Sequence, residues 1–291
     1  MGCIEVRIKE VKILLPIHDN LSGRVAVVTG GSGVLCSEMC RELAKHGVKI
    51  AILNRNTNKG EEVAEDIRKS GGIASSFAAD VLHRTSLEKA REEIIQLYGK
   101  VNILINGAGG NHPDAITAPE KYGEDITGKT FFDLEEDGFS KVFATNFTGA
   151  FLTSQVFGKE LLKQDSPVII NISSMSAYAP MTKVPAYSAA KAAINNFTMW
   201  MATHFANTGL RVNAIAPGFF LTNQNKDLLL NEDGSLTERS RKILANTPMN
   251  RFGEPKELLG TLLWLVDETY SGFVTGVTVP VDGGFMAYSG V

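Results

Sequence analysis

The chain has 291 residues, of which 44% are hydrophobic, and a formal net charge of −3. Strand–helix patterns run along it without a Pro/Gly/Ser-rich linker, which favours one large α/β domain over two small ones. The weak charge gives no reason to expect nucleic acid as a partner, and no apolar run approaches the ~20 residues of a membrane-spanning helix. Three cysteines without paired spacing favour a reducing cytoplasm, and the absence of zinc-type His/Cys spacing predicts no metal site.

Residues 1–20 precede the first strand of this domain, and we interpret them as an N-terminal extension. Ile4, Val6 and Ile8 alternate with charged residues, which is a strand-like period. The stretch is too short and too interrupted by charge for a secretory signal. We expect a frayed or surface-packed extension, with a role at a subunit interface as the alternative.

Short apolar runs rich in β-branched residues predict seven strands, at 25–29, 48–53, 73–79, 101–105, 168–173, 211–215 and 276–281. Helical patterns lie between them, for example at 34–46, 61–70, 86–98, 138–162, 189–206 and 255–267. Continuously apolar strands that alternate with helices are typical of a parallel sheet covered on both faces. The pattern therefore predicts a doubly wound, Rossmann-like α/β fold of about seven strands, as a single domain over residues 21–291.

The first strand runs into the glycine-rich turn Thr29-Gly-Gly-Ser-Gly33 and then into a helix. Glycines let the backbone approach a ligand closely, and a helix N-terminus receives phosphate, so the turn predicts dinucleotide binding. In the general G-x-G-x-x-G pattern the third glycine is Cys36 here, and because that position serves close helix–strand packing, we expect a tight fit. Cys36 and Cys40 share a helix face and are expected to be small core residues, with a redox pair as the alternative.

Tyr187 and Lys191 are four residues apart and share one face of a predicted helix. A free phenol has a pKa near ~10 and is a poor base at neutral pH. A cation ~5 Å away would contribute ~3 kcal/mol toward lowering that pKa, so the pair is a predicted proton-transfer device. Ser174 directly follows the strand at 168–173, where active groups of open α/β sheets gather, and we expect it to face the ligand.

From about residue 21 to the C-terminus, the chain resembles the short-chain dehydrogenase/reductase family. The matching pieces are Thr29-Gly30, Asp80-Val81, Asn106 to Gly109, Asn146, Ser174, Tyr187 with Lys191, Pro217-Gly218 with Thr222, and Val281 to Gly284. Within that family, the segments GGSGVLC, NGAGGNHP, TPMNRFGEP and DGGFMAYSGV are similar to D-mannonate oxidoreductases (fructuronate reductases). The resemblance implies the strand order 3-2-1-4-5-6-7 and a homotetramer or homodimer, with 138–162 and 189–206 as packing helices.

The resemblance also implies an NAD(P)-dependent oxidoreductase that interconverts a secondary alcohol and a ketone. Tyr187 would be the acid/base, Lys191 would lower the pKa of Tyr187 and hold the ribose hydroxyls, and Ser174 would bond the reacting oxygen. Asn146 would anchor a water, with a helix kink or buried polar contact as the alternative. The implied cofactor-binding residues, besides Tyr187 and Lys191, are Gly30, Ser32, Gly33, Val34, Leu35, Asn54, Arg55, Asp80, Val81, Asn106, Gly107, Ala108, Pro217, Gly218 and Thr222.

The end of the second strand bears on the choice between NAD and NADP. A carboxylate there binds the ribose hydroxyls and repels a 2′-phosphate, but this chain has Leu53-Asn54-Arg55-Asn56. Asn54 can bond ribose hydroxyls, and Arg55 can clamp a phosphate unless it is a solvated surface residue. We predict NAD(P)(H) use with a slight lean to NADP(H). Asp80 is expected to bind the adenine amine, with a helix N-cap as the alternative.

Two segments are expected to enclose the substrate, the long loop at 110–140 and a helical lid at 219–250. A sugar acid needs a cation or several donors for its carboxylate, and the candidates are Asn111, His112, Lys183, Gln224 and Asn225, each with simple solvent exposure as the alternative. The favoured reaction interconverts D-mannonate and D-fructuronate. The alternatives are a gluconate 5-dehydrogenase-like enzyme, a 3-oxoacyl thioester reductase, and a non-catalytic nucleotide-binding regulator, which has no need of the Ser/Tyr/Lys/Asn set.

Overall fold

The computed structural model describes residues 18–123, 127–222 and 225–290. In these ranges the strands are β1 (Val25–Thr29), β2 (Lys49–Asn54), β3 (Ala74–Ala78), β4 (Ile103–Asn106), β5 (Val168–Ile172), β6 (Arg211–Pro217) and β7 (Thr278–Val281). The α-helices are α1 (Val34–Lys45), α2 (Thr57–Lys69), α3 (Arg84–Tyr98), α4 (Glu136–Phe143), α5 (Gly149–Leu161), α6 (Pro185–His204), α7 (Lys226–Leu229), α8 (Glu238–Ala245), α9 (Leu259–Val266) and α10 (Glu268–Ser271). The short helices are η1 (Asp19–Leu21), η2 (Pro113–Ala115), η3 (Phe131–Asp133), the π-helical η4 (Ala144–Thr148), η5 (Met175–Ala177), η6 (Ala206–Thr208) and η7 (Pro255–Leu258).

The strands form one parallel sheet in the order β3-β2-β1-β4-β5-β6-β7. This order confirms the prediction, and each predicted strand overlaps an observed one. The order reverses between β1 and β4, and open α/β sheets bind ligands beyond the carboxyl ends of the strands at such a switch point. β1, β4, β5 and β6 are buried along their whole length, as parallel strands covered on both faces should be.

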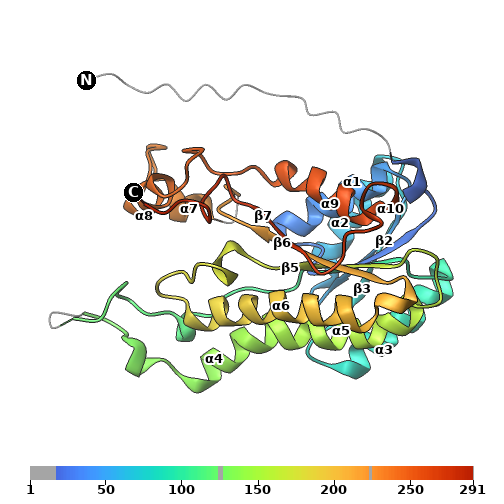
Figure 1. Cartoon of the computed structure of the whole chain (residues 1–291), viewed down its shortest axis with the longest axis horizontal. Coiled ribbons are helices and arrows are strands. Elements are labelled where there is room, and N and C mark those ends of the chain that lie inside the picture. Colours follow the sequence, from blue (N-terminus) through green and yellow to red (C-terminus); the bar gives the residue numbers. More distant parts are fainter. Residues whose placement is uncertain (1–17, 124–126, 223–224, 291) are drawn as a thin grey trace.

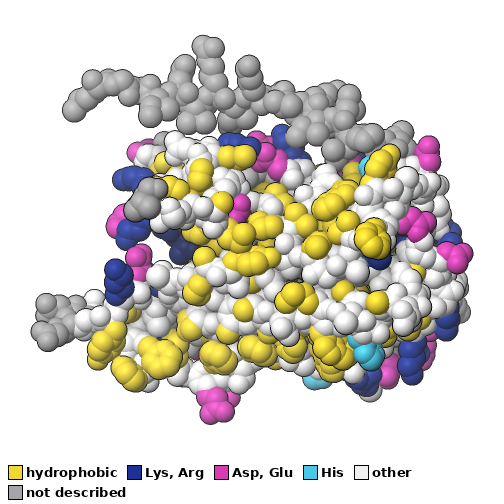
Figure 2. Space-filling model, in the orientation of Figure 1, with side chains coloured by type: hydrophobic (Ala, Val, Ile, Leu, Met, Phe, Trp, Pro, Cys, Tyr) yellow, Lys and Arg dark blue, Asp and Glu magenta, His cyan; other side chains and the backbone are white. Residues whose placement is uncertain are grey.

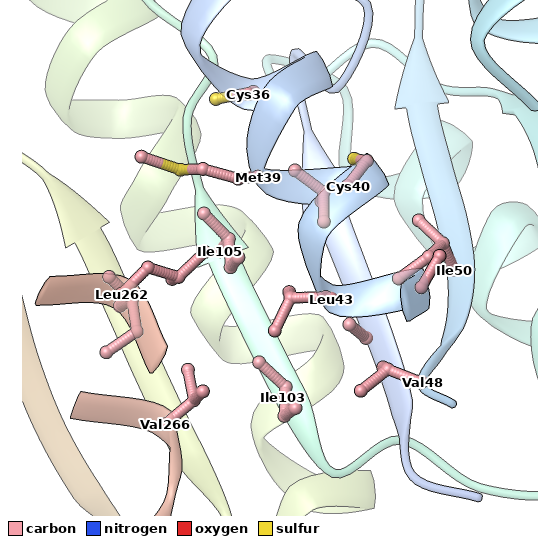
Figure 3. Packing of buried hydrophobic residues seen from close by; sticks show 14 of the residues in the cluster. Cys36, Met39, Cys40, Leu43, Val48, Ile50, Ile103, Ile105, Leu262 and Val266 are labelled. Carbon is pink, nitrogen blue, oxygen red and sulfur yellow. The ribbon is translucent and has the colours of Figure 1, made fainter. Parts of the chain in front are cut away.

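Helices cover both faces of the sheet (Figure 1). On one face α1 and α9 pack against the central strands, and Figure 3 shows Met39 and Leu43 of α1 beside Ile105 of β4 and Leu262 of α9. On the other face α3, α5 and α6 enclose a second hydrophobic layer that contains the fully buried Phe157. The predicted doubly wound, Rossmann-like architecture is confirmed.

The long helix predicted over 138–162 is confirmed as a continuous helical stretch over 136–161, but its middle turn is π-helical. α4 ends at Phe143, the π-helix η4 follows, and α5 begins at Gly149. Short π-helical turns are frequent at functional sites, and this one contains Asn146. The helix predicted over 255–267 is divided, because its first turn is the 3-10 helix η7.

Most of the predicted N-terminal extension lies outside the described residues, but its end packs onto the domain. The backbone N–H of His18 donates to Nδ1 of His46 at 3.0 Å, and Nδ1 of His18 lies 2.7 Å from Oδ2 of Asp267. These bonds attach the chain before β1 to the ends of α1 and α9. Among the helices of the described ranges, none is long and apolar enough to cross a membrane.

Candidate active site

Tyr187 and Lys191 lie one turn apart near the start of α6, which has Pro185 at its first position, where proline is well tolerated. Nζ of Lys191 lies 5.5 Å from the centre of the Tyr187 ring, so the predicted adjacency of the two side chains is confirmed. The same Nζ donates to the carbonyl oxygen of Ile172, the last residue of β5, at 2.7 Å. This bond fixes the lysine at the carboxyl end of β5.

Ser174 lies at the same strand end and is buried. It is the N-cap of η5, where its Oγ accepts a hydrogen bond from the N–H of Ser176 at 3.2 Å. Its hydroxyl also lies near enough to Tyr187 to influence the pKa of the phenol. The end of β5 and the first turn of α6 therefore bring the two hydroxyl groups together, as the sequence predicts.

The pKa values differ from the prediction that Lys191 lowers the pKa of Tyr187. Burial raises the pKa of Tyr187 above its usual value, and the nearby hydroxyl of Ser174 opposes this shift. Burial lowers the pKa of Lys191 to about 8, while the nearby Cys36 thiol acts in the opposite direction. Desolvation penalises the charged form of both groups. Tyr187 is therefore a neutral phenol in the protein alone, and the predicted lowering of its pKa is wrong for this state.

Asn146 lies buried in η4 and binds the loop that follows β4. Its Nδ2 donates to the carbonyl oxygens of Gly110 at 2.7 Å and Val142 at 2.8 Å, and its Oδ1 accepts from the N–H of Gly110 at 3.2 Å. A Cβ on the preceding Gly109 would lie 3.5 Å from Nζ of Lys191. The buried polar contact foreseen as the alternative for Asn146 is thus present, and its water-anchoring role stays a prediction.

A cavity of about 510 Å³ lies beyond the carboxyl ends of β1 to β4. Among the predicted cofactor-binding residues it is lined by Gly30, Ser32, Asn54, Arg55, Asp80, Val81 and Ala108, and not by Gly33, Val34, Leu35, Asn106, Gly107, Tyr187, Lys191, Pro217, Gly218 or Thr222. Gly109 and Thr145 line it as well, which brings the cavity next to Asn146. Gly109 belongs to the family-like segment Asn106 to Gly109, whereas Thr145 was not predicted, although it directly precedes Asn146. The other lining residues that were not predicted are Leu53, Asn56, Ala79 and Leu82.

The glycine-rich turn beside this cavity fits a nucleotide phosphate. Gly30 has a φ of 64°, and a Cβ there would lie 3.0 Å from Cα of Ala108. α1 begins after Gly33 without a side-chain cap, so the N–H groups of its first turn are available to an anion. A Cβ on Gly107 would overlap Sγ of Cys36, so the cysteine in the third glycine position packs as tightly as predicted.

Asn54 ends β2 and its side chain binds the glycine-rich turn. Its Oδ1 accepts from the N–H of Ser32 at 3.1 Å and from its hydroxyl at 3.0 Å, while its buried Nδ2 has no partner. Arg55 is exposed. The carboxylate of Asp80 accepts from the N–H of Leu82 at 2.9 Å and so stabilises the turn after β3, but the N-cap of α3 is another residue, His83.

Asn106 is placed differently from the expectation of a cofactor contact. Its buried amide donates to Oγ of Ser154 at 3.0 Å and to Oδ1 of Asn171 at 2.9 Å. The amide of Asn171 in turn donates to Oγ1 of Thr198 at 2.9 Å. The side chain of Asn106 therefore connects β4 to β5, α5 and α6 in the core, where it is not open to a nucleotide.

The predicted substrate residues lie in separate segments. Lys183 precedes α6 with a φ of 70°, and its carbonyl oxygen accepts from the N–H of Thr117 at 2.9 Å. Asn111 is exposed and His112 half-buried in the loop after β4. The amide of Asn225 donates to the carbonyl oxygen of Phe220 and accepts from the N–H of Thr222, both at 2.8 Å. Its NH₂ group and its oxygen can each make one further hydrogen bond. Gln224 lies outside the described residues.

The ends of β6 and β7 approach each other closely beyond Pro217. A Cβ on Gly218 would lie 2.6 Å from Cα of Asp282, so only glycine fits there. Phe219 and Asp282 line a cavity of about 380 Å³ at this place. In the described parts of the chain, no three His, Cys, Asp or Glu side chains are grouped closely enough to hold a metal ion.

A family model described as short chain dehydrogenase matches residues 24–233. The chain belongs to the short-chain dehydrogenase family. As a member of this family, it is an oxidoreductase that acts on a CH–OH group and binds NAD(P). This identification confirms the reaction class that the sequence motifs indicate.

Three relatives bear on the details of this short-chain dehydrogenase. UxuB of Bacillus subtilis (strain 168), an uncharacterized oxidoreductase, is 71% identical over 278 residues, which cover 96% of this chain and 100% of the relative. A solved structure from Haemophilus influenza, provisionally named D-mannonate oxidoreductase and containing bound NAD, is 50% identical with a TM-score of 0.91, covering 93% of this chain and 98% of that one. A gluconate 5-dehydrogenase from Burkholderia cenocepacia J2315 in complex with NADP and tartrate is 28% identical with a TM-score of 0.79, covering 92% and 98%.

Proposed function

We propose that this short-chain dehydrogenase interconverts a secondary alcohol and a ketone of a sugar acid, with D-mannonate and D-fructuronate as the favoured pair. The grouping of Ser174, Tyr187 and Lys191 at the carboxyl end of β5 carries the proposal. The sugar-acid substrate is supported by the similarity to the provisionally named D-mannonate oxidoreductase and to the gluconate 5-dehydrogenase. A non-catalytic regulator is disfavoured because nucleotide binding alone needs no phenol beside an ammonium.

When bound, the nicotinamide supplies the hydride chemistry, and side chains of the protein transfer the proton. In reduction the neutral phenol of Tyr187 donates its proton to the carbonyl oxygen and becomes a phenolate, and in oxidation the phenolate takes the proton of the alcohol. The hydroxyl of Ser174 holds the reacting oxygen beside Tyr187. Because Nζ of Lys191 lies 5.5 Å from the tyrosine ring, its charge stabilises the phenolate that reduction leaves behind. In this proposal, Lys191 also binds the ribose hydroxyls.

We propose that the cavity beyond β1 to β4 holds the adenosine and diphosphate parts of the cofactor. The turn at Gly30 to Gly33 would receive the phosphates, and the residues after β2 and β3 would flank the adenosine. No carboxylate lines the cavity at the end of β2, where Asn54 and Arg55 lie. This composition supports use of both NAD(H) and NADP(H), with a slight lean to NADP(H).

We propose a homodimer or homotetramer. Phe151 of α5 and Trp200 of α6 are 37% and 56% exposed, and Figure 2 shows hydrophobic side chains along the edge of the molecule where α4, α5 and α6 lie in Figure 1. Large exposed apolar patches are typical of protein–protein interfaces. Analytical ultracentrifugation tests this, since a monomer at micromolar concentration would contradict it. The cytoplasmic location stays a prediction.

An absorbance assay of nicotinamide reduction and oxidation tests the function. The panel contains D-mannonate, D-gluconate, a 3-oxoacyl thioester and the neutral polyol D-mannitol, each with NAD(H) and NADP(H). We expect turnover of a sugar acid, with D-mannonate preferred. Turnover of the thioester alone would replace the substrate assignment, and no turnover of any compound would support the regulator. A ~100-fold preference for NAD in kcat/KM would contradict the lean to NADP.

A further inference from the structure

The segment 109–115, in the loop after β4, lies beside two of the catalytic candidates. At its start, a Cβ on Gly109 would lie 3.5 Å from Nζ of Lys191. At its end, Ala115 of η2 is fully buried and belongs to a small hydrophobic cluster that packs against Tyr187. His112 therefore stands in the middle of a short segment whose first residue lies near Lys191 and whose last residue belongs to the cluster that packs against Tyr187.

The carboxylate of Asp114 lies between the side chains of His112 and Lys129. Nδ1 of His112 lies 3.3 Å from Oδ2 of Asp114, and Oδ1 of Asp114 lies 3.5 Å from Nζ of Lys129. Asp114 also packs closely against α4, because a Cβ on Gly138 of that helix would lie only 2.6 Å from Cβ of Asp114. Asp114 is thus a fixed carboxylate between a histidine and a lysine.

These contacts orient the His112 ring and leave Nε2 as a hydrogen-bond donor. Nδ1 accepts from the backbone N–H of Asp114 at 3.4 Å, which makes His112 the N-cap of η2. In this arrangement a neutral ring carries its hydrogen on Nε2. When the ring is protonated, Nδ1–H turns to the carboxylate of Asp114 and Nε2 keeps its hydrogen. Within residues 18–123, 127–222 and 225–290, no protein group bonds to Nε2.

We propose that His112 binds the sugar-acid substrate through Nε2–H, and that Asp114, supported by Lys129, is a positioning residue for the His112 ring. This inference rests on the proposed function. A sugar acid brings a carboxylate and several hydroxyls to the site, whereas Lys191 is buried and already bonded to Ile172. A further donor beside Tyr187 is therefore required. Lys129 offsets the charge of Asp114, so the carboxylate that orients the ring leaves no net negative charge beside an anionic substrate.

The test is steady-state kinetics of His112→Asn and Asp114→Asn with the sugar acid that the wild-type enzyme turns over. Asparagine is a good N-cap, so His112→Asn keeps the start of η2 while it removes the ring. We expect KM for the acid to rise ~10-fold in His112→Asn and ~3- to 10-fold in Asp114→Asn, with kcat within ~3-fold and KM for the nucleotide unchanged. The matched control Glu135→Gln removes the same charge from the same loop and should leave all constants near wild type.

The double variant separates positioning from a structural role. If Asp114 acts through His112, the double variant has the KM of His112→Asn alone, because the ring that Asp114 orients is already absent. Losses that multiply, or that appear in kcat and the melting temperature instead of KM, would overturn the role of Asp114. KM values within ~2-fold of wild type in both single variants would overturn the role of His112. A wild-type enzyme that turns over no sugar acid would instead show that the proposed function has failed.

Discussion

The side-chain amide of Asn146 is bonded to both backbone polar groups of Gly110, which it contacts at 2.7 and 3.2 Å. The same amide also donates to the carbonyl oxygen of Val142, four residues earlier in its own helix. In a regular α-helix that carbonyl accepts the backbone N–H of Asn146. The side chain thus competes with the backbone at the point where α4 gives way to η4, and it joins this turn to the loop after β4.

Asn146→Ala is expected to impair both stability and turnover. It leaves the two polar groups of Gly110 without their partner, and we expect the free energy of unfolding to fall by ~2–4 kcal/mol. Because Gly109 adjoins Lys191, we also expect kcat to fall at least ~10-fold. Urea unfolding and steady-state kinetics measure the two effects. Asn246→Ala is the control. It removes a similar hydrogen bond, from a side-chain amide to a carbonyl four residues earlier, but at an exposed helix end, and should lower neither stability nor kcat. A variant that matches wild type in both assays would contradict this role.

The sheet was predictable because strands covered on both faces are continuously apolar, and this signal is local in the sequence. The grouping of Tyr187 with Lys191 was predictable for a similar reason, since helical periodicity alone places residues four apart on one face. The position of Ser174 follows from the rule that active groups gather at carboxyl strand ends. These features depend on pattern and topology, so the fold and the centre of the site were both predictable.

Features that depend on which side chains meet in space were not predictable. The direction of the Tyr187 pKa shift is set by burial, which requires the packing of Ala115 and its neighbours against the ring. The amide of Asn106 could equally have faced a nucleotide until Ser154 was known to lie beside it. The bond that joins η4 to the loop after β4 connects Asn146 to a glycine 36 positions away. None of these contacts has a local signal.

Tyr187→Phe is expected to lower kcat at least ~100-fold, because the variant has no group that donates or accepts the proton. The ring remains, so the dissociation constant of the nucleotide, measured by fluorescence titration, should change little. Tyr98→Phe is the matched control: it removes the hydroxyl of another half-buried tyrosine, which bonds to Ser75 of β3, and should keep wild-type kcat. Near-normal turnover in Tyr187→Phe would remove this residue from the mechanism.

The rate of carbonyl reduction is expected to fall as the pH rises through about 8. Burial lowers the pKa of Lys191 from 10.5 to about 8, so the ammonium loses its charge well before a free lysine would. A neutral amine no longer stabilises the phenolate of Tyr187. The profile of kcat/KM against pH reports ionisations of the free enzyme and measures this limb. Lys191→Met should have a low rate that does not fall further as the pH rises through 8. A wild-type profile that stays flat up to pH 10.5 would contradict the assignment of this ionisation to Lys191.

The lowered pKa of Lys191 also predicts how the free energy of unfolding depends on pH. Between pH about 8 and 10.5 the unfolded chain holds a proton on Lys191 that the folded protein has released. The unfolded state therefore binds more protons in this interval, and the contribution of Lys191 to the free energy of unfolding rises with pH. Subtracting urea-unfolding curves of Lys191→Met from those of wild type across this interval isolates the contribution. A difference that falls or stays constant as pH rises would show that the lysine is not desolvated.

Cys36 and Gly107 are expected to compensate for each other in stability. A Cβ on Gly107 would overlap Sγ of Cys36 and lie 2.9 Å from the carbonyl oxygen of Thr29. Gly107→Ala should therefore lower the free energy of unfolding by ~1–3 kcal/mol through overpacking. Burial raises the pKa of the Cys36 thiol to about 11, so it packs as a neutral group. Cys36→Gly should cost ~1 kcal/mol in helix propensity, in addition to the packing that the thiol provides.

In the double variant the new methyl group occupies space that the thiol has vacated, so the two losses should not add. We expect Cys36→Gly/Gly107→Ala to be more stable than the sum of the single variants by ~1 kcal/mol or more, measured by urea unfolding. The compensation should be partial, because the carbonyl oxygen of Thr29 still crowds the methyl group. Strict additivity would mean that the backbone alone forbids a side chain at position 107. In that case contact with the Cys36 thiol would not be what restricts position 107 to glycine.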